Sequence, residues 1–175
     1  MLQLSRLAKR APAELEDELR EAQETTRASL DDVRRIARQL RPEALDDLGL
    51  VPALAALAKT FTERTELRVH RRLDENLPPL SAEAELALFR VAQESLTNAA
   101  RHSGSSRIDL WLQSSPDDVL LRVRDYGKGL NGARPGGGMR GMRERALLVG
   151  GDLTIESAAG GGGEVRLRVP AAKGQ

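Results

Sequence analysis

Three short polar segments have residue types and spacing suited to binding a phosphorylated nucleotide with a divalent metal ion. They read ESLTN at 94–98, DYGKG at 125–129 and GGGMRG at 136–141. On a helix, Glu94 and Asn98 project from one face because they lie four residues apart. An Asn amide oxygen is a ligand that Mg²⁺ accepts, and a nearby carboxylate can orient a water molecule. A solvent-exposed polar face is the alternative for such a pair taken alone.

The second segment places a carboxylate at the end of a predicted strand. Asp125 there can accept a hydrogen bond from the exocyclic amino group of a base, and Gly127 and Gly129 permit the positive φ values of a tight turn. An ordinary Asp-X-Gly turn would have the same sequence.

The third segment lies at the entry to a predicted helix that begins at Met139. Gly136, Gly138 and Gly141 would let a phosphate approach the unpaired N–H groups and the positive dipole of that helix end. A flexible loop is the alternative. His102, just beyond Asn98, could also reach a phosphate, although a histidine there can instead serve as a cation at a helix C-terminus.

Hydrophobic periodicity indicates the elements that must position these segments. Ser81 is a good N-cap for a helix that runs to about residue 101 and carries Glu94 and Asn98. A connector is predicted at 43–49, followed by a helix at 52–65. Another helix is predicted at 139–148. Alternating runs predict strands at 67–73, 107–113, 119–125, 152–157 and 164–169. The economical arrangement is an α+β fold with a mixed sheet covered on one face by helices.

The first residues show a different pattern. Residues 13–40 have the apolar periodicity of a long amphipathic helix. Residues 2–10 have the pattern of a shorter helix, and Pro12 separates the two. A narrow apolar seam needs a partner, so we expect an antiparallel hairpin that forms a four-helix homodimer with a second copy. Packing on its own domain is the alternative. The predicted domains are a helical hairpin at 1–41 and a nucleotide-binding domain at 42–175.

Composition excludes several classes of protein. The 27 Lys and Arg residues are balanced by 26 Asp and Glu, and aromatics make up 2%, which argues against nucleic-acid binding. The absence of cysteine excludes disulfides and thiolate metal sites and is compatible with a reducing compartment. The apolar stretch at 50–58 is too short to cross a bilayer, and no signal peptide follows Met1. We therefore expect a cytoplasmic fragment that makes no membrane contact itself, whether or not a membrane-anchored parent carries it.

In this order, the three segments resemble the ATP-binding motifs of histidine kinases. ALFRVAQESLTNAARHS at 87–103 is similar to their N box, DYGKG to the G1 box, and GGGMRGMRERA at 136–146 to the G2 box. These motifs belong to the GHKL superfamily, whose fold is the Bergerat ATP-binding α/β sandwich. LRPEALDDLGLVPAL at 40–54 and GMRERALLVGGDLTIES at 141–157 resemble the sensor histidine kinases that partner NarL-type response regulators.

The resemblance implies a role for each candidate residue. Asn98 would bind Mg²⁺, Glu94 would be catalytic beside the metal or phosphate, and Asp125 would bind the adenine amino group of ATP. The other implied ATP-binding residues are His102, Gly127, Gly129, Gly136, Gly138, Met139, Gly141 and Met142. In the intact protein, the γ-phosphoryl group would pass to a histidine on the hairpin and then to a response regulator.

Two departures from the family pattern lead to further hypotheses. The family's phosphoacceptor histidine lies near the start of the hairpin, whereas the histidines here are His70 and His102. A truncated core that binds ATP without phosphorylating itself is therefore expected. The family usually has GGT where this chain reads GGGGEV, so Glu164 is expected near ATP, where it would weaken binding. A non-catalytic dimeric scaffold and a GHKL protein-serine kinase are the alternative functions.

Overall fold

The structure, a computed structural model, describes Thr25 and residues 42–65, 67–129 and 137–172. The chain divides into two compact units, Met1–Pro42 and Glu43–Gln175. Apart from Thr25, the helices predicted at 2–10 and 13–40 lie outside the described residues, so the hairpin and its dimer stay predictions.

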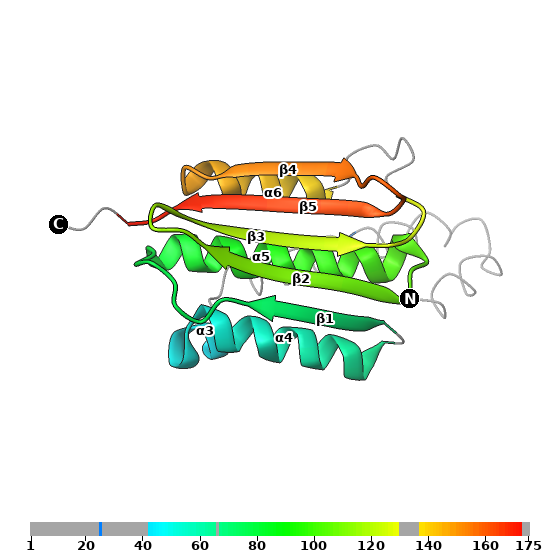
Figure 1. Ribbon diagram of the computed structural model, residues 1–175, viewed down its shortest axis with the longest axis horizontal. Helices are drawn as coiled ribbons and strands as arrows, with labels where there is room; N and C mark the ends of the chain where they lie inside the picture. The colour runs from blue at the N-terminus through cyan, green and yellow to red at the C-terminus, as the bar shows by residue number, and fades with distance from the viewer. Residues whose placement is uncertain (1–24, 26–41, 66, 130–136, 173–175) are drawn as a thin grey trace. The chain divides into compact units, whose positions relative to one another are not determined.

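Five strands form one mixed sheet in the order β1-β2-β3-β5-β4 (Figure 1). The parallel pair is β1 with β2, and the other three pairs are antiparallel. The predicted mixed sheet is thus confirmed. The strand bounds are Arg68–Leu73 for β1, Arg107–Ser114 for β2, Asp118–Asp125 for β3, Asp152–Ser157 for β4 and Gly163–Pro170 for β5.

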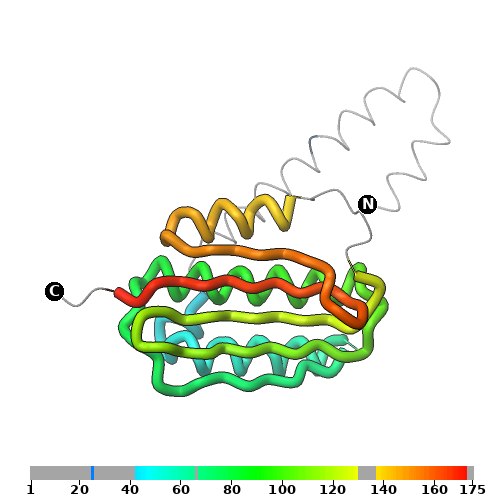
Figure 2. Tube along the Cα trace, turned by 45° about the horizontal axis from the view of Figure 1, so that its top comes forward, coloured from blue at the N-terminus to red at the C-terminus, as the bar shows by residue number. Residues whose placement is uncertain are grey.

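The helices pack on one face of this sheet, as Figures 1 and 2 show. Helix α5 (Ala82–Asn98) is central and contacts both α4 (Leu50–Arg64) and α6 (Gly137–Leu148) as well as β3 and β5. This two-layer arrangement confirms the α+β prediction. Among the described residues, no helix combines the length and the apolar character that spanning a bilayer requires.

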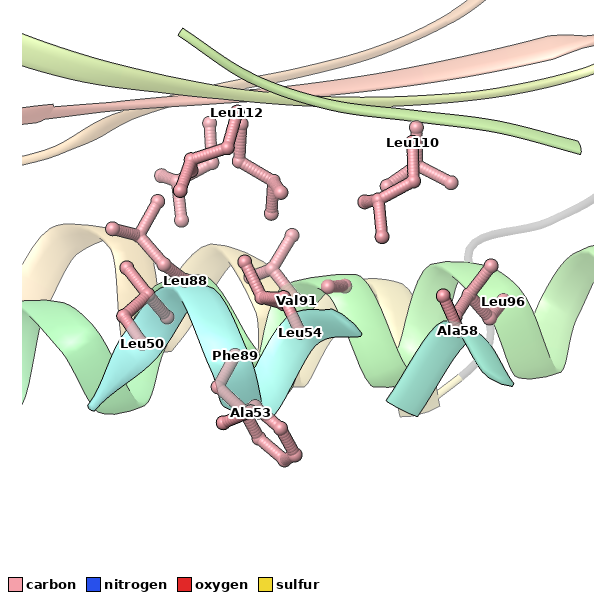
Figure 3. Close-up of a cluster of buried hydrophobic side chains, with 14 of the residues drawn as sticks. Leu50, Ala53, Leu54, Ala58, Leu88, Phe89, Val91, Leu96, Leu110 and Leu112 are labelled. Atoms are coloured by element: carbon pink, nitrogen blue, oxygen red, sulfur yellow. The ribbon is translucent and has the colours of Figure 1, made fainter. Parts of the chain in front are cut away.

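An aliphatic core joins the two layers. Alternate residues of β2, Ile108, Leu110 and Leu112, are fully buried. Figure 3 shows Leu110 and Leu112 pointing from the sheet toward α5, where Leu88 and Val91 face them. Full burial of each such side chain contributes about 1.5–3 kcal/mol. The core therefore holds α5, and with it Glu94 and Asn98, in a fixed position over the sheet.

The prediction of a connector at 43–49 is wrong, because a short helix, α3 (Glu43–Leu48), forms there. Leu45 is only 1% exposed, and Glu43 and Asp46 lie in the first turn, where acidic residues favour the helix dipole. Gly49, with φ 80°, follows its last residue. A helix of one or two turns is stabilised by tertiary packing and is too short for a periodic sequence pattern to reveal.

Helix α5 begins and ends with recognisable caps. The Ser81 side chain accepts a hydrogen bond from the backbone N–H of Ala84 at 3.2 Å, which confirms the predicted N-cap. After Asn98 the helix continues as a π-helical turn, Ala99–Ser103, and Gly104 with φ 66° ends it. Because a π turn holds more residues than an α turn, it changes the direction of the side chains that follow Asn98.

Candidate functional site

A cavity of about 380 Å³ lies where the C-terminal part of α5, the end of β3 and the first turn of α6 meet. Its volume falls in the range of small-molecule sites. Seven residues predicted from the sequence line it: Asn98, His102, Asp125, Gly129, Gly138, Met139 and Met142. Segments separated by tens of residues in the sequence thus contribute to one cavity.

Asp125 is held by two backbone hydrogen bonds at the edge of the cavity. Its Oδ1 accepts from the N–H of Gly127 at 2.9 Å, and its Oδ2 accepts from the N–H of Gly163 at 3.1 Å. Each carboxylate oxygen has a second lone pair. Asp125 is therefore oriented by the backbone while it keeps acceptor capacity for a ligand.

Gly127 allows the turn after Asp125 to approach the end of α5. A Cβ atom at Gly127 would lie 2.0 Å from the backbone oxygen of Ser103, and the next residue, Lys128, donates its N–H to that same oxygen at 2.9 Å. No side chain fits between these two backbones. The glycine of the DYGKG segment thus brings the turn against the helix that carries Asn98.

A second close approach supports Asp125 from the β4–β5 loop. Gly162 has φ 87°, and a Cβ atom there would lie 1.9 Å from the backbone oxygen of Asp125. Gly163, the first residue of β5 after this loop, supplies the N–H that binds the carboxylate. The loop therefore contacts Asp125 at its backbone, and the residue that follows the loop contacts its side chain.

The predicted metal pair lies beside the start of α6. Asn98 lines the cavity, whereas Glu94 lies one helical turn away, against Gly138. A Cβ atom at Gly138 would lie 1.9 Å from Glu94 Oε1. With glycine at 138, the Glu94 carboxylate can lie against the first turn of α6, whereas a larger residue would require that carboxylate to move.

Gly141, a described glycine of the third segment, does not line the cavity. It lies inside α6, and a Cβ atom there would meet the Arg145 guanidinium at 3.3 Å. The cavity therefore gives no support to the predicted role of Gly141 in ATP binding. Gly136 lies outside the described residues, so its role stays a prediction.

The expectation that the Glu164 carboxylate lies beside ATP is wrong in its geometry, whereas its effect on ATP affinity stays a prediction. Residues Val165, Leu167 and Val169 of β5 face the helices, so Glu164 has the opposite parity, and its carboxylate forms ion pairs with Arg122 and Arg166. Glu164 is only 3% exposed. Although it borders the cavity through its place in β5, its negative charge is neutralised on the other face of the sheet.

Sequence reasoning missed the cavity residues that carry no distinctive chemistry. Ser95 lies one turn before Asn98 and Ala99 directly follows it, and the four-residue spacing of Ser95 and Ala99 could have indicated them. Val123, Ile155 and Val165 lie on the core side of their strands, which alternation could have indicated. These missed residues, with Ser103 and Gly163, complete a lining in which apolar atoms predominate.

The protein groups that could bind a cation here are few, which suits a metal ion whose other ligands are water and substrate phosphate. The described residues contain no cluster of three or more His, Cys, Asp or Glu side chains that could hold a metal ion. Mg²⁺ usually keeps several water molecules and is shared with substrate phosphates, so it needs few protein ligands. One amide with one nearby carboxylate fits Mg²⁺ bound together with a phosphate better than a metal bound alone.

Tyr126, the residue after Asp125, points to the other side of the sheet. Its hydroxyl donates to Asp109, and this hydrogen bond is the main cause that raises the pKa of Tyr126 above its usual value. Partial burial and the charge of Asp109 add to the rise, whereas Arg107 and Arg124 oppose it. Burial alone would raise the pKa of Asp109, but hydrogen bonds from Arg107 and Tyr126 outweigh burial and lower it.

Tyr126 should therefore ionise above the usual tyrosine pKa of about 10. It is the only tyrosine, so ultraviolet absorbance of the tyrosinate reports on it alone. Because its folded-state pKa is raised, its contribution to stability is complete below about pH 10 and is lost as pH rises through the folded-state pKa. Asp109→Asn should lower the titration midpoint. A midpoint at or below that of free tyrosine would contradict this assignment.

The chain is similar to known histidine kinases in the region that contains these motifs. Residues 83–173 match the family described as histidine kinase-, DNA gyrase B-, and HSP90-like ATPase, and residues 1–45 match HisKA_3, described as histidine kinase. A sensor histidine kinase, MctS of Rhizobium johnstonii, is 38% identical over 144 residues, which cover 79% of this chain and 31% of that protein. The signal transduction histidine-protein kinase/phosphatase DegS of Brevibacillus brevis is 34% identical over 159 residues, or 87% of this chain and 40% of that protein.

Solved structures show the same fold. The histidine kinase domain from the Erythrobacter litoralis EL346 blue-light activated histidine kinase has a TM-score of 0.63 at 20% identity, covering 96% of this chain and 90% of that chain. This identity supports the fold alone. The chain spans less than half of the length of the two curated relatives, at 31% and 40%.

Proposed function

Since the chain belongs to the family of histidine kinase-, DNA gyrase B-, and HSP90-like ATPases and carries the catalytic core of a sensor histidine kinase, we propose that its cavity binds Mg·ATP for phosphoryl transfer to a histidine. The observation that carries this proposal is that Asn98 and Asp125 line one cavity. The first is suited to the metal, the second to the base.

The base would lie at the Asp125 end. The carboxylate, oriented by Gly127 and Gly163, would accept a hydrogen bond from the adenine amino group. Apolar side chains, among them Met139, Met142 and Ile155, would contact the faces of the purine. A planar heterocycle with one exocyclic donor matches a lining that is mostly apolar with one fixed acceptor.

The triphosphate would extend toward Asn98, His102 and the first turn of α6. N–H groups at a helix start stabilise phosphate through hydrogen bonds and the helix dipole. Asn98 would supply an amide oxygen to Mg²⁺, which when bound would neutralise charge on the phosphates. His102 and Gly129 also line the cavity, which supports their assignment as nucleotide contacts.

Glu94 is proposed as the catalytic carboxylate. It lies one turn from Asn98 on α5 and beside Gly138 at the start of α6, which is the end of the cavity assigned to phosphate. There it can orient the attacking group or a water molecule on the metal. Positioning and charge neutralisation are the main contributions that a protein makes to phosphoryl transfer.

The whole protein's partners follow from the family rather than from the cavity. We propose that the segment at 1–41, which contains no histidine, contributes to a homodimer. A NarL-type response regulator would receive the phosphoryl group from an acceptor histidine that is absent from this chain. The match of residues 1–45 to HisKA_3 supports this proposal. The scaffold alternative loses one of its two arguments, because the Glu164 carboxylate is paired with Arg122 and Arg166.

Calorimetric titration with ATP, with and without Mg²⁺, tests the proposal. Wild type should bind ATP more tightly with Mg²⁺, and Asn98→Ala should lose most of that Mg²⁺-dependent gain while it still binds the metal-free nucleotide. Asp117→Asn, an exposed change in the β2–β3 turn, is the control and should behave as wild type. The absence of heat at millimolar nucleotide would instead favour a non-catalytic scaffold.

A further inference from the structure

We infer that Tyr126 and Asp109 are positioning residues, which hold Asp125 for nucleotide binding from the face of the sheet opposite to the cavity. This inference rests on the proposed function, because it assigns Asp125 to the base. It concerns the open face of the sheet, which we define by Asp109 and Trp111 of β2, Arg122 and Arg124 of β3, and Glu164 and Arg166 of β5. In the described part of the chain, no helix covers this face (Figures 1 and 2).

A buried carboxylate is the centre of the arrangement. Asp109 is 3% exposed although it lies on the open face. It accepts two hydrogen bonds from Arg107, from Nε to Oδ1 at 2.9 Å and from an Nη atom to Oδ2 at 2.9 Å, and a third from the Tyr126 hydroxyl. A buried charge is retained at little cost only when it is paired and hydrogen-bonded in this way.

The ring of Tyr126 completes the burial of that carboxylate. The Arg107 and Arg124 guanidinium groups lie 5.1 and 4.9 Å from the centre of the ring, within the range of cation–π attraction. The tyrosine is still 43% exposed, so burial of its apolar area contributes little to stabilising this position. Polar bonds to neighbouring segments account for it better.

These bonds tie together the backbone segments that surround Asp125. Arg124 donates to the backbone oxygen of Ala159 at 2.9 Å, which fixes the loop whose Gly162 packs on Asp125. The Tyr126 N–H is 3.4 Å from Ser105 Oγ, in the segment just after the π turn. Both neighbours of Asp125 in the chain, Arg124 and Tyr126, therefore form side-chain hydrogen bonds that hold them in place.

The consequence for the cavity is geometric. The Asp125 oxygens accept from Gly127, in the turn that Tyr126 anchors, and from Gly163, the first residue of β5 after the loop that Arg124 anchors. A displacement of either segment would rotate the carboxylate away from a bound base. Recognition groups are effective only within a fraction of an ångström of the required position, so neighbouring residues that hold them matter.

A double-mutant cycle on nucleotide affinity separates this role from a general effect on stability. Tyr126→Phe keeps the ring and removes the bond to Asp109, and it should weaken ADP binding about three- to tenfold, the usual effect of one hydrogen bond. If Tyr126 acts through Asp125, the same change in an Asp125→Asn background should have less than about a twofold effect. Unchanged affinity in Tyr126→Phe, or fully additive effects, would overturn the inference.

Amide hydrogen exchange without nucleotide provides a readout independent of the proposed function. Tyr126→Phe should accelerate exchange at Gly127 and Gly163, whose N–H groups bind Asp125, and leave exchange at Leu121 in the sheet core unchanged. Asp118→Asn is the matched control, since it removes the negative charge of the Arg168–Asp118 ion pair at the far end of β3. Equal acceleration in both variants, or none in Tyr126→Phe, would refute the positioning role.

The two failures can be told apart. If wild type binds no ADP, the proposed function fails, and the exchange data still decide whether Tyr126 holds the Asp125 turn. If wild type binds ADP and Tyr126→Phe binds it equally well, only the positioning role fails.

Discussion

Replacing Asp125 by Asn should weaken binding of adenine nucleotides by about 1–3 kcal/mol. The reason lies in the two backbone donors, because Gly127 uses one carboxylate oxygen and Gly163 uses the other. An Asn side chain offers one oxygen and one NH₂ group, so one of these N–H groups would face another donor. Rotating the amide only changes which of the two N–H groups faces the NH₂ group. The single amide oxygen would then have to serve both a backbone N–H and the adenine amino group.

Calorimetry with ADP measures this effect directly, and an inosine nucleotide, which lacks the exocyclic amino group, provides the internal control. Asp125→Asn should lower affinity for ADP and change affinity for the inosine nucleotide much less. Asp117→Asn should bind both as wild type does. Equal ADP binding by Asp125→Asn and wild type would remove Asp125 from the base-binding site.

Gly127→Ala should reduce the free energy of unfolding by about 2–3 kcal/mol, the upper range for a buried steric conflict. The added Cβ would lie 2.0 Å from the Ser103 oxygen and 2.5 Å from the carbonyl carbon. Neither atom can rotate away as the end of a side chain could. Separating the backbones would break the hydrogen bond from Lys128 to the same oxygen, and nucleotide affinity should fall as well.

Denaturant unfolding followed by the fluorescence of Trp111, the only tryptophan, gives the measurement. Gly137→Ala is the matched control, because no atom lies within 4 Å of the added Cβ and its φ is not positive. That variant should be within about 0.5 kcal/mol of wild type, or slightly more stable. If both variants unfold at the same denaturant concentration, the close approach of Gly127 to Ser103 is not a constraint on the fold.

The prediction that failed most informatively concerned Glu164. A deviation from a familiar motif suggested a carboxylate beside ATP, yet the alternation of Val165, Leu167 and Val169 was enough to place Glu164 on the other face of the strand. Strand parity is a physical constraint, because successive side chains point to opposite faces. Motif position alone carries no such information.

Local sequence was sufficient for the longer helices of the second unit and for the five strands. The Ser81 cap, the apolar repeat of α5 and the alternation of the central strands depend on residues within one or two turns of one another, so single-sequence patterns reveal them. The chemistry of Asn98 and Asp125 could be inferred in the same way. The helix α3 could not, because its formation depends on burying Leu45 in the core, where it packs with α4.

Tertiary structure decided how Asp125 is held. Its bond to Gly163 joins residues 38 positions apart, and the bond from Tyr126 to Asp109 spans 17 positions. Such contacts depend on strand register and on the closeness of two backbones, which glycines permit but do not specify. The sequence by itself therefore determined which groups could bind a nucleotide, and the packing of the sheet determined which of them meet and what orients them.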